Sequence, residues 1–541
     1  MRTDVLNMIL GYTLALLTIP IVLIGVVSCF IDSWQFAAVT FGIPALMCGS
    51  LAGLMIGTFT RTDSKNRVRD REAFVAVGLM YPIAVLISAI PFWFGGMFVG
   101  PFEDGATLNE MLQGAAFSWF EAMSGYTTTG ATVIDISTSP MCFTMTAADD
   151  CIFAQSRGLL LWRSMTQWLG GMGIIMLGMM ILSSKIGGGM ALARAELTGP
   201  TVSKLHPSFR QTAYALWGLY FICTMMLFLL LFGIGDLSFF DAVNHALTTM
   251  PTGGFSVHDD SIGFYNSAIV ETIIIVFMVI AGINFTLIWL LTHKRAKEAI
   301  SDEELKSFIL YLFTATTIIF LVLYKWQGDW QGSIRSGLFN VVSIGTSTGF
   351  GTDDYVLWPV ATHVILFFLM IIGASAGSTG GGLKILRIGL AAKLARREIS
   401  KIAQPRKVHQ IRYNNKPIDD SYLSLIIGML LVWVGLFAFS SLILAFYMPD
   451  SSLETIVSIV ASSLGNTGPA LGDYGPSSTW ESMPIPVLIF TSILMWFGRL
   501  ELLTAILLLS FKTWKKEAKS DAEIQGVALV KKILQGKENN D

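Results

Sequence analysis

Long apolar runs recur along the chain and limit what it can fold into. A helix needs about 20 consecutive apolar residues to cross the hydrocarbon core of a bilayer. Hydrophobic residues make up 53% of the sequence and charged residues only 14%, which excludes an ordinary soluble protein. The sequence predicts an all-α polytopic membrane protein with about ten spans. They lie at 8–30, 36–59, 73–99, 157–184, 211–235, 264–292, 307–324, 361–395, 421–447 and 484–511.

Basic residues are concentrated in alternate loops between these runs. Because Lys and Arg mark cytoplasmic loops, both termini are expected in the cytoplasm of a cell-membrane protein. The opposite loops are poor in basic residues and contain many acids, which would raise the local concentration of cations. The alternative is that these acids only reflect the exclusion of basic residues. The basic loops are 61–71, 185–210, 294–306, 393–416 and 512–537.

A Thr-Gly pair occurs four times in the outer loops, each time after a short apolar segment. These segments are too short to cross a core of about 30 Å, so each is expected to enter and return from the outer side as a re-entrant pore helix. The segments are 109–126, 239–250, 333–346 and 452–465. The pairs are Thr129-Gly130, Thr252-Gly253, Thr348-Gly349 and Thr467-Gly468.

This repetition predicts four pseudo-symmetric helix–pore-loop–helix units around a central pore, preceded by an extra pair of transmembrane helices. We expect the helix pair and its cytoplasmic loop in residues 1–70. The four pore repeats are then expected at 71–205, 206–300, 301–415 and 416–512, and a cytoplasmic tail at 513–541.

The backbone around the Thr-Gly pairs is expected to bind ions. Non-helical backbone at membrane depth is tolerated only where it is buried in protein or lines water. Glycine allows successive carbonyls to face one side, and carbonyl rings replace the hydration shell of potassium. A single Thr-Gly pair is more typical of an ordinary outer turn, but four in register favour a filter. The candidate potassium ligands are Thr128, Thr129, Gly130, Thr252, Gly253, Thr348, Gly349, Asn466, Thr467 and Gly468.

Five glycines in ten residues interrupt the run at 361–395. Each interior glycine costs a helix about 1 kcal/mol relative to alanine, so we expect an intramembrane loop below the filter. Close helix packing through small residues is the alternative. A phosphate-binding loop is excluded because Leu383 stands where that motif requires lysine. The glycines are Gly373, Gly377, Gly380, Gly381 and Gly382.

Arg499 lies within the last apolar run. A charge at that depth is costly, so it is expected to face an aqueous path or a partner. One hypothesis places Arg499 in the pore beneath the filter, as an electrostatic barrier that weakens cation binding. The alternative is a buried ion pair with an acid from another helix. Arg163 lies nearer the end of its span and is expected to be structural.

The remaining polar residues give little support for an enzyme. No nucleophile, base and oxyanion constellation and no nucleotide-binding motif is found in the sequence, and Glu121 and Glu271 are interpreted as hydrogen-bonding groups within the helices. Cys142 and Cys151 lie in one outer loop, where a disulfide is possible. The other three cysteines are expected to be packing residues.

Several motifs resemble the Trk/Ktr/HKT superfamily of potassium-uptake proteins. They are "SGYTTTGAT", "MPTGGFS", "GTSTGFGT", "GNTGPALG", "WRSMTQWLGGMGI" and "GASAGSTGGGLKI". The extra helix pair favours the TrkH-type membrane subunit over the shorter Ktr type. The resemblance implies one filter segment per repeat at Gly130, Gly253, Gly349 and Gly468. Glycine at position 130, where some sodium-favouring relatives have serine, argues for potassium.

The same resemblance implies a setting for the chain. The glycine-rich loop would occlude the ion path and move on opening, together with Arg499. A homodimer in the bacterial inner membrane would bind cytosolic Rossmann-like regulatory subunits of the TrkA type. The basic loop from Lys393 to Lys416 and the tail from Lys512 are candidate docking surfaces, with lipid headgroups as the alternative. Potassium is the transported ion, and no organic cofactor is expected in this chain.

Two kinds of transport remain open at this point. The first is a potassium permease with a fixed filter and channel-like conduction. The alternative is a cation-coupled secondary transporter, a sodium- or proton-linked potassium symporter with alternating access, in which broken helices bind the substrate at the midplane. Fourfold repetition of pore loops favours the first.

Overall fold

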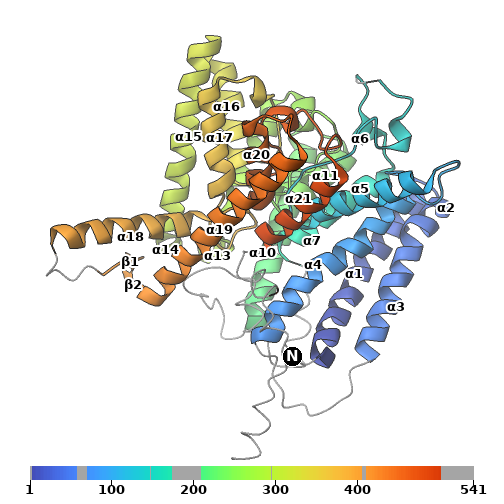
Figure 1. Cartoon of the computed structure of the whole chain (residues 1–541), viewed down its shortest axis with the longest axis horizontal. Helices are drawn as coiled ribbons and strands as arrows, with labels where there is room; N and C mark the ends of the chain where they lie inside the picture. Colours follow the sequence, from blue (N-terminus) through green and yellow to red (C-terminus); the bar gives the residue numbers. More distant parts are fainter. Residues whose placement is uncertain are drawn as a thin grey trace, which may run out of the picture.

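The chain folds into a bundle of helices, as the computed structural model in Figure 1 shows. The model describes residues 3–57, 70–146, 148–173, 209–293, 295–404, 410–500 and 508. Within these residues the only strands are β1 (Arg412–Tyr413) and β2 (Lys416–Pro417), which form a small antiparallel hairpin. The expectation of an all-α polytopic membrane fold is confirmed.

An antiparallel helix pair precedes the first repeat. It is formed by α1 (Thr3–Ile31) and α3 (Ile43–Gly57), which pack along their length. The turn between them contains α2 (Trp34–Ala37), which begins where the Ser33 side chain accepts a hydrogen bond from Phe36 N, and a π-helical turn, η1 (Ala38–Gly42). The pair packs against α4 and α7 of the first repeat, and Figure 1 shows it at the edge of the molecule.

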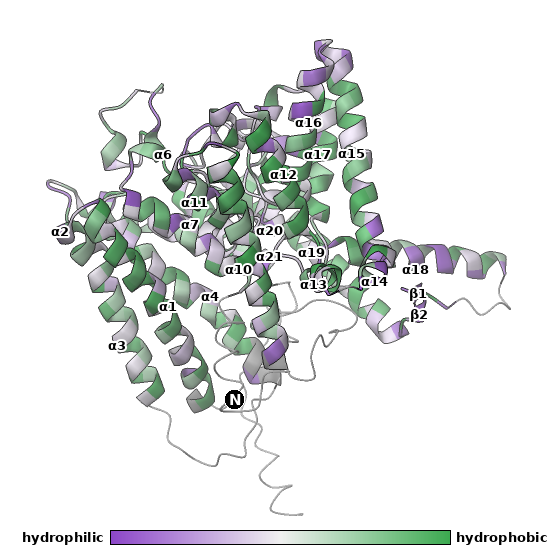
Figure 2. Ribbon diagram, turned by 180° about the vertical axis from the view of Figure 1, so that it is seen from behind, coloured by the Kyte–Doolittle hydropathy of each residue, from purple (hydrophilic) through white to green (hydrophobic). Residues whose placement is uncertain are grey.

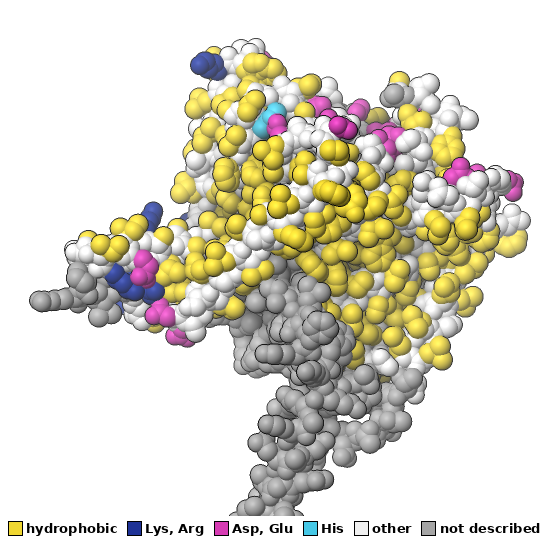
Figure 3. All heavy atoms as spheres, in the orientation of Figure 1, with side chains coloured by type: hydrophobic (Ala, Val, Ile, Leu, Met, Phe, Trp, Pro, Cys, Tyr) yellow, Lys and Arg dark blue, Asp and Glu magenta, His cyan; other side chains and the backbone are white. Residues whose placement is uncertain are grey.

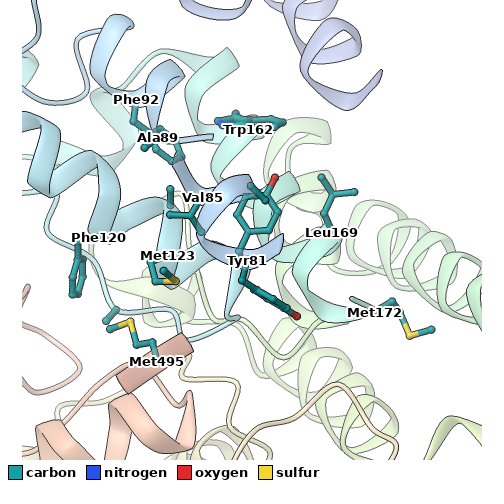
Figure 4. Close-up of a cluster of buried hydrophobic side chains, with 14 of the residues drawn as sticks. Tyr81, Val85, Ala89, Phe92, Phe120, Met123, Trp162, Leu169, Met172 and Met495 are labelled. Atoms are coloured by element: carbon teal, nitrogen blue, oxygen red, sulfur yellow. The ribbon is translucent and has the colours of Figure 1, made fainter. Parts of the chain in front are cut away.

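The first repeat has a core of large apolar side chains. Its elements are α4 (Asp70–Phe94), α5 (Leu108–Tyr126), η2 (Pro140–Cys142), α6 (Cys151–Ala154) and α7 (Arg157–Gly171). Figure 4 shows Ala89 and Phe92 of α4 near Trp162 of α7, and Met495 of the fourth repeat near Met123 of α5. The first and fourth repeats therefore share part of one core.

The other repeats follow the same plan. The second contains α10 (Phe209–Gly233), α11 (Phe239–Thr249), η3 (Ser261–Tyr265), α12 (Ala268–Gly282) and α13 (Phe285–Thr292). The third contains α14 (Ala296–Ser301), α15 (Glu303–Gln327), α16 (Trp330–Gly345), η4 (Tyr355–Leu357), α17 (Val360–Ile372) and α18 (Ile385–Ala403). The fourth contains α19 (Asp420–Tyr447), α20 (Leu453–Gly465), η5 (Gly472–Tyr474) and α21 (Ile485–Arg499).

The four short helices α5, α11, α16 and α20 lie where the sequence predicts re-entrant pore helices. Each begins at a side chain that satisfies free backbone N–H groups, namely Thr107, Ser238, Asp329 and Ser452. Their C-terminal halves are buried and lead directly into the Thr-Gly segments. Because a helix carries partial negative charge at its C-terminus, these ends favour a nearby cation.

Six helices or helix runs among the described residues are long and apolar enough to cross a membrane. They are α1, the run from α2 to α3, α4, α10, α15 and α19, and a bent pair, α12 and α13, would be a seventh. Two further expected spans, 157–184 and 484–511, extend beyond the described residues. The expected run at 361–395 is divided between α17 and α18.

The expected span at 264–292 is not continuous. Its two helices, α12 and α13, meet at an angle of 105°. Asn284 starts the new helix, because its side chain accepts a hydrogen bond from Thr286 N at 2.8 Å. The carbonyls of Ala281 and Gly282 bond to Thr379 N and Ser375 N instead of continuing the helix. The break therefore exists because the glycine-rich loop supplies the missing backbone partners.

The surface reflects the membrane setting. Figure 2 shows hydrophobic residues distributed over the long helices, and Figure 3 shows a broad apolar belt below a rim with acidic side chains. Helix α18 does not continue upright after α17 but runs sideways away from the bundle (Figure 1). Basic side chains gather at this projecting part (Figure 3).

Candidate functional site: a ring of four segments above a glycine-rich loop

The four segments after the pore helices share one backbone conformation. Each has a residue with positive φ, then an ordinary residue, then a glycine with positive φ. The first positions are Thr128, Thr252, Ser347 and Asn466, and the glycines are Gly130, Gly254, Gly349 and Gly468. The middle residue of each segment donates its N–H to the carbonyl five residues earlier in the pore helix, at 2.7 to 3.0 Å. The segments are therefore structurally equivalent.

These segments close a ring in chain order. A Cβ built on Gly130 would lie 2.2 Å from the carbonyl oxygen of Gly253 in the second repeat. The same relation joins Gly254 to Thr348 O at 2.0 Å, Gly349 to Thr467 O at 2.2 Å and Gly468 to Thr129 O at 2.5 Å. Only glycine fits at these four positions, because any side chain would overlap a carbonyl of the next repeat.

In the second segment the equivalent residues do not follow the Thr-Gly pair. They lie one position later in the sequence than the pairing of Thr252-Gly253 with Thr129-Gly130 predicts. Gly254, not Gly253, has positive φ and contacts the next repeat, while Gly253 takes the place of Thr129. Thr252 likewise corresponds to Thr128 and not to Thr129. Sequence reasoning missed Gly254 and Ser347. The second glycine of "PTGG" could have indicated Gly254. Ser347 could have been found by aligning "TSTG" of the third repeat with "TTTG" of the first, where it matches Thr128.

Several oxygens in the segments are buried without a partner. Within the described part of the chain, Oγ1 of Thr128 and Thr467 and Oδ1 of Asn466 accept and donate no hydrogen bond. Hydroxyl groups pair in two of the segments: Thr127 with Thr129 at 2.8 Å and Thr346 with Thr348 at 2.7 Å. Because buried polar groups are normally satisfied, unpartnered oxygens here favour a bound cation or water.

The glycine-rich loop lies directly beneath this ring. It connects α17 to α18 and closes on itself, since Leu383 N and Lys384 N donate to Ile371 O and Ile372 O at 3.0 Å each. Gly381 N donates to Ser347 Oγ at 2.5 Å. A Cβ on Gly381 would lie 2.1 Å from Gly465 O of the fourth repeat. The loop therefore contacts the ring too closely to allow side chains at this point.

The loop also contacts the second repeat. The Thr379 hydroxyl donates to Met250 O at 3.0 Å and lies 3.5 Å from the Thr252 hydroxyl. Phe285 is the first residue of α13, and its backbone N–H donates to Gly377 O at 3.1 Å. Gly373, Gly377 and Gly382 have positive φ, whereas Gly380 and Gly381 are required by close approach alone. The expected interruption of the helix is thus present.

Arg499 ends α21 and reaches the same loop. Its Nη1 donates to Thr379 O at 2.7 Å, and its Nη2 donates to Gly170 O and Gly171 O at 2.8 Å each. Among the described residues, these three hydrogen bonds all go to backbone carbonyls, and no acid forms an ion pair with Arg499. The guanidinium is half-buried and connects the loop to the C-terminal end of α7.

Two charged residues that the sequence analysis left out also hold the loop. The Lys384 ammonium donates to Gly380 O, and Lys384 is buried with positive φ. Glu304, near the start of α15, accepts a hydrogen bond from Ala376 N at 2.6 Å. A lysine next to "GGGL" within an apolar run was the available signal for the first. Nothing local marked Glu304, because its partner is 72 residues away.

Comparisons with known proteins agree with this geometry. The family model described as "TrkH: Cation transport protein" matches residues 104–517. The Trk system potassium uptake protein TrkH of Escherichia coli (strain K12) is 35% identical over 459 residues, which cover 84% of this chain and 88% of that protein. TrkH of Halomonas elongata is 32% identical over 513 residues, covering 93% and 96%.

The chain belongs to the TrkH family.

A solved structure gives the same result for the fold. The crystal structure of the potassium transporter TrkH from Vibrio parahaemolyticus matches with a TM-score of 0.80 at 26% identity, covering 95% of this chain and all of that one. The family expected from the motifs is therefore confirmed. TrkH relatives are potassium uptake transporters, which also confirms that the chain is a transport protein and not an enzyme.

In this TrkH-family chain, one buried and one partly exposed ion pair lie near the ring. Glu121 of α5 pairs with Arg163 of α7 at 2.6 Å, and Arg163 donates to Ser256 O at 2.7 Å. Glu121 also accepts from Val133 N at 3.1 Å, so the pair connects the first and second segments. Glu271 pairs with Arg335 of α16 at 2.7 Å. Arg163 therefore has the structural position expected of it.

The outer loop of the first repeat is fixed to the second. Cys142 and Cys151 form a disulfide with their Cα atoms 5.6 Å apart. Cys48 and Cys223 are buried, whereas Cys29 is exposed and contributes little to packing. Asp150, beside the disulfide, accepts a hydrogen bond from His258 Nδ1 at 2.6 Å. The described residues contain no cluster of His, Cys, Asp and Glu that could hold a metal ion.

Proposed function

We propose that this chain takes up potassium across the cell membrane through the ring of four segments, and that the loop from Gly373 to Gly382 gates the path. The ring of carbonyls with unpartnered oxygens of Thr128, Thr467 and Asn466 supports this proposal most directly. Oxygen ligands of this kind replace the hydration shell of a potassium ion. The names of its relatives, potassium uptake proteins, support the same ion.

The ring is the proposed ion-binding site. Its ligands are the ten filter residues expected from the sequence, to which the equivalent positions Ser347 and Gly254 are added. Each of the four units 71–205, 206–300, 301–415 and 416–512 contributes one segment. With one glycine-centred turn per repeat, the ring offers fewer ion positions than a long ladder of carbonyls would.

The gate is the proposed role of the glycine-rich loop and Arg499. The loop lies against the second, third and fourth segments, so an ion leaving the ring toward the cytoplasm meets it first. Arg499 and Lys384 add positive charge beneath the ring, which raises the energy of a cation there. Moving the loop aside opens the path.

A potassium-uptake experiment tests the main proposal. Cells that lack their own potassium uptake are given the wild-type chain or Gly468→Ser, and growth at limiting potassium and rubidium uptake are measured with sodium as competitor. We expect the wild type to restore growth and the variant to lose discrimination against sodium. A wild-type chain that is present in the membrane but moves no rubidium overturns the proposal.

Regulation by a partner is part of the same proposal. The relatives are named as parts of a Trk system, which supports a multi-subunit assembly. We propose a homodimer of this chain, with both termini in the cytoplasm of a bacterial inner membrane, that binds TrkA-type Rossmann-like subunits. The C-terminal half of α18 is largely exposed and is one candidate surface. The tail from Lys512 lies outside the described residues.

Coupled symport is the second candidate. It is favoured by the break between α12 and α13, which meets the break between α17 and α18, because paired broken helices are typical of secondary transporters. Rubidium uptake into proteoliposomes with and without a sodium or proton gradient separates the two. Uptake that follows the potassium gradient alone supports the fixed filter.

A further inference from the structure

Gln167 of α7 is buried behind the filter segment of the second repeat. Its Nε2 donates to Gly253 O at 2.6 Å, and its Oε1 accepts from Phe255 N at 3.2 Å. The two partners fix the orientation of the amide, because a carbonyl only accepts and an N–H only donates. Gln167 therefore bonds to the backbone on both sides of Gly254, the ring glycine of this segment.

The side chain of Gln167 fills the space that a threonine occupies in the other repeats. The residue equivalent to Gly253 is Thr129, Thr348 or Thr467. A Cβ on Gly253 would lie 2.3 Å from Cδ and Oε1 of Gln167. Gly253 itself does not have positive φ, so its backbone would accept a side chain. The three atoms nearest to this Cβ all belong to Gln167, which therefore blocks a side chain at position 253.

The second segment is the only one of the four without a threonine at its middle position, although the fourth, with Gly465 ahead of Thr467, also lacks a hydroxyl pair. In the first and third segments a pair of threonine hydroxyls lies beside the backbone. The second segment has Pro251 and Gly253 at those two positions, so it has no such pair. The Gln167 amide bonds to this segment from another helix, and it does so on Gly253 O, the carbonyl that contacts Gly130.

We propose that Gln167 is a positioning residue that sets the selectivity of the ring, because it fills the space of the threonine found in the other repeats and holds Gly253 O from behind. The proposal rests on the proposed function of the ring as a potassium filter. Discrimination between cations depends on where the carbonyl oxygens are held and on how strongly they bind. A carbonyl that loses its donor moves more freely and binds a smaller ion more readily.

Exchange of the two side chains tests this proposal. Rubidium uptake per membrane-inserted protein is measured with sodium as competitor, in wild type and in four variants. The variants are Gln167→Ala, Gln167→Glu, Gly253→Thr and the double variant that combines Gln167→Ala with Gly253→Thr. Glutamate keeps the size of glutamine and can accept from Phe255 N, but as a carboxylate it cannot donate to Gly253 O. Gln155→Ala is the matched control, because Gln155 is also buried but bonds to the outer loop.

The expected results differ for each variant. Gln167→Ala and Gln167→Glu lower discrimination against sodium about fivefold, the factor that one hydrogen bond provides. Gly253→Thr alone loses uptake, because the new side chain overlaps Gln167. The double variant recovers uptake, because alanine makes room for the threonine. Gln155→Ala keeps wild-type discrimination even if less protein reaches the membrane.

Two outcomes overturn the proposal. One is wild-type discrimination in Gln167→Glu, and the other is a double variant no better than Gly253→Thr. If Gln167→Ala does not reach the membrane, Gln167→Glu and the double variant still decide. A wild-type chain that moves no rubidium overturns the proposed function instead. The thermal stability of the purified double variant, compared with Gly253→Thr, then tests the exchange without transport.

Discussion

Arg499 and Thr379 are joined by a hydrogen bond of 2.7 Å between a guanidinium nitrogen and a backbone carbonyl. The same guanidinium binds Gly170 O and Gly171 O at the end of α7. One side chain therefore holds the glycine-rich loop against the first repeat, although the loop belongs to the third. This contact replaces the acid partner that a buried arginine would otherwise need.

Removing this contact should release the loop. A hydrogen bond from a charged group contributes about 1.5–3 kcal/mol, which is a factor of about 10 to 150. Arg499→Ala should therefore increase the population of a displaced loop by at least about tenfold and raise rubidium uptake per inserted protein. Arg499→Lys keeps the charge but cannot bind both elements with one planar group, so it should be intermediate. Unchanged uptake per protein with less protein in the membrane would show that Arg499 only stabilises the fold.

The ring glycines should tolerate no side chain. Gly130→Ala places a methyl group against Gly253 O and should abolish rubidium uptake. Gly96→Ala is the control, because Gly96 also has positive φ but nothing within 4 Å of the new Cβ. It carries only the conformational cost of about 1–2 kcal/mol. Equal losses of uptake in the two variants would show that backbone conformation, and not contact with the next repeat, decides.

Glu304 should control how firmly the loop is held in place. Its carboxylate accepts a hydrogen bond from Ala376 N, while the N–H of the adjacent Glu303 donates to Asn414 Oδ1 near the β-hairpin. Glu304→Ala removes a bond of about 1.5–3 kcal/mol and should raise basal rubidium uptake. Glu298→Ala, which breaks an exposed pair with Arg295, should not. No rise in Glu304→Ala would exclude a role in closure.

His258 should make the outer loop sensitive to pH. Burial disfavours the imidazolium, but the carboxylates of Asp150 and Asp241 outweigh this and raise the pKa of His258 above its ordinary value. The interaction therefore stabilises the fold fully below the ordinary pKa of about 6.5 and is lost as pH rises through the raised pKa.

Thermal unfolding in detergent at several pH values measures this effect. The stability difference between wild type and His258→Gln should be largest in acid and should shrink as pH rises above neutrality. His293→Gln, which changes an exposed histidine, serves as the control. A difference that grows with pH would contradict the assignment.

The sequence predicts the elements that depend on hydrophobic length and glycine content. The expected segments 109–126 and 452–465 nearly coincide with α5 and α20, and the glycine cluster does interrupt its helix. Both signals are local. A segment of about 13 to 19 residues is too short to cross the membrane, and a dense glycine cluster destabilises a helix, whatever lies elsewhere in the sequence.

Other features depended on partners far away in the sequence. The space of a side chain at Gly253 is filled by Gln167, which is 86 residues away. The break after Gly282 follows from hydrogen bonds to Ser375 and Thr379, and the apolar content of 264–292 gives no sign of it. The partners of Arg499 are backbone carbonyls, which every residue has, so no residue type could reveal them.

The ring also constrains how the protein is made. Its last contact joins the fourth repeat to the first, where Asn466 Nδ2 donates to Thr129 Oγ1 across 337 positions of the chain. Contacts of such long range form late, after the cost of closing the intervening chain has been met. The first segment therefore remains open on one side throughout synthesis and membrane insertion. A chain truncated before the fourth repeat would hold three segments without a closed ring.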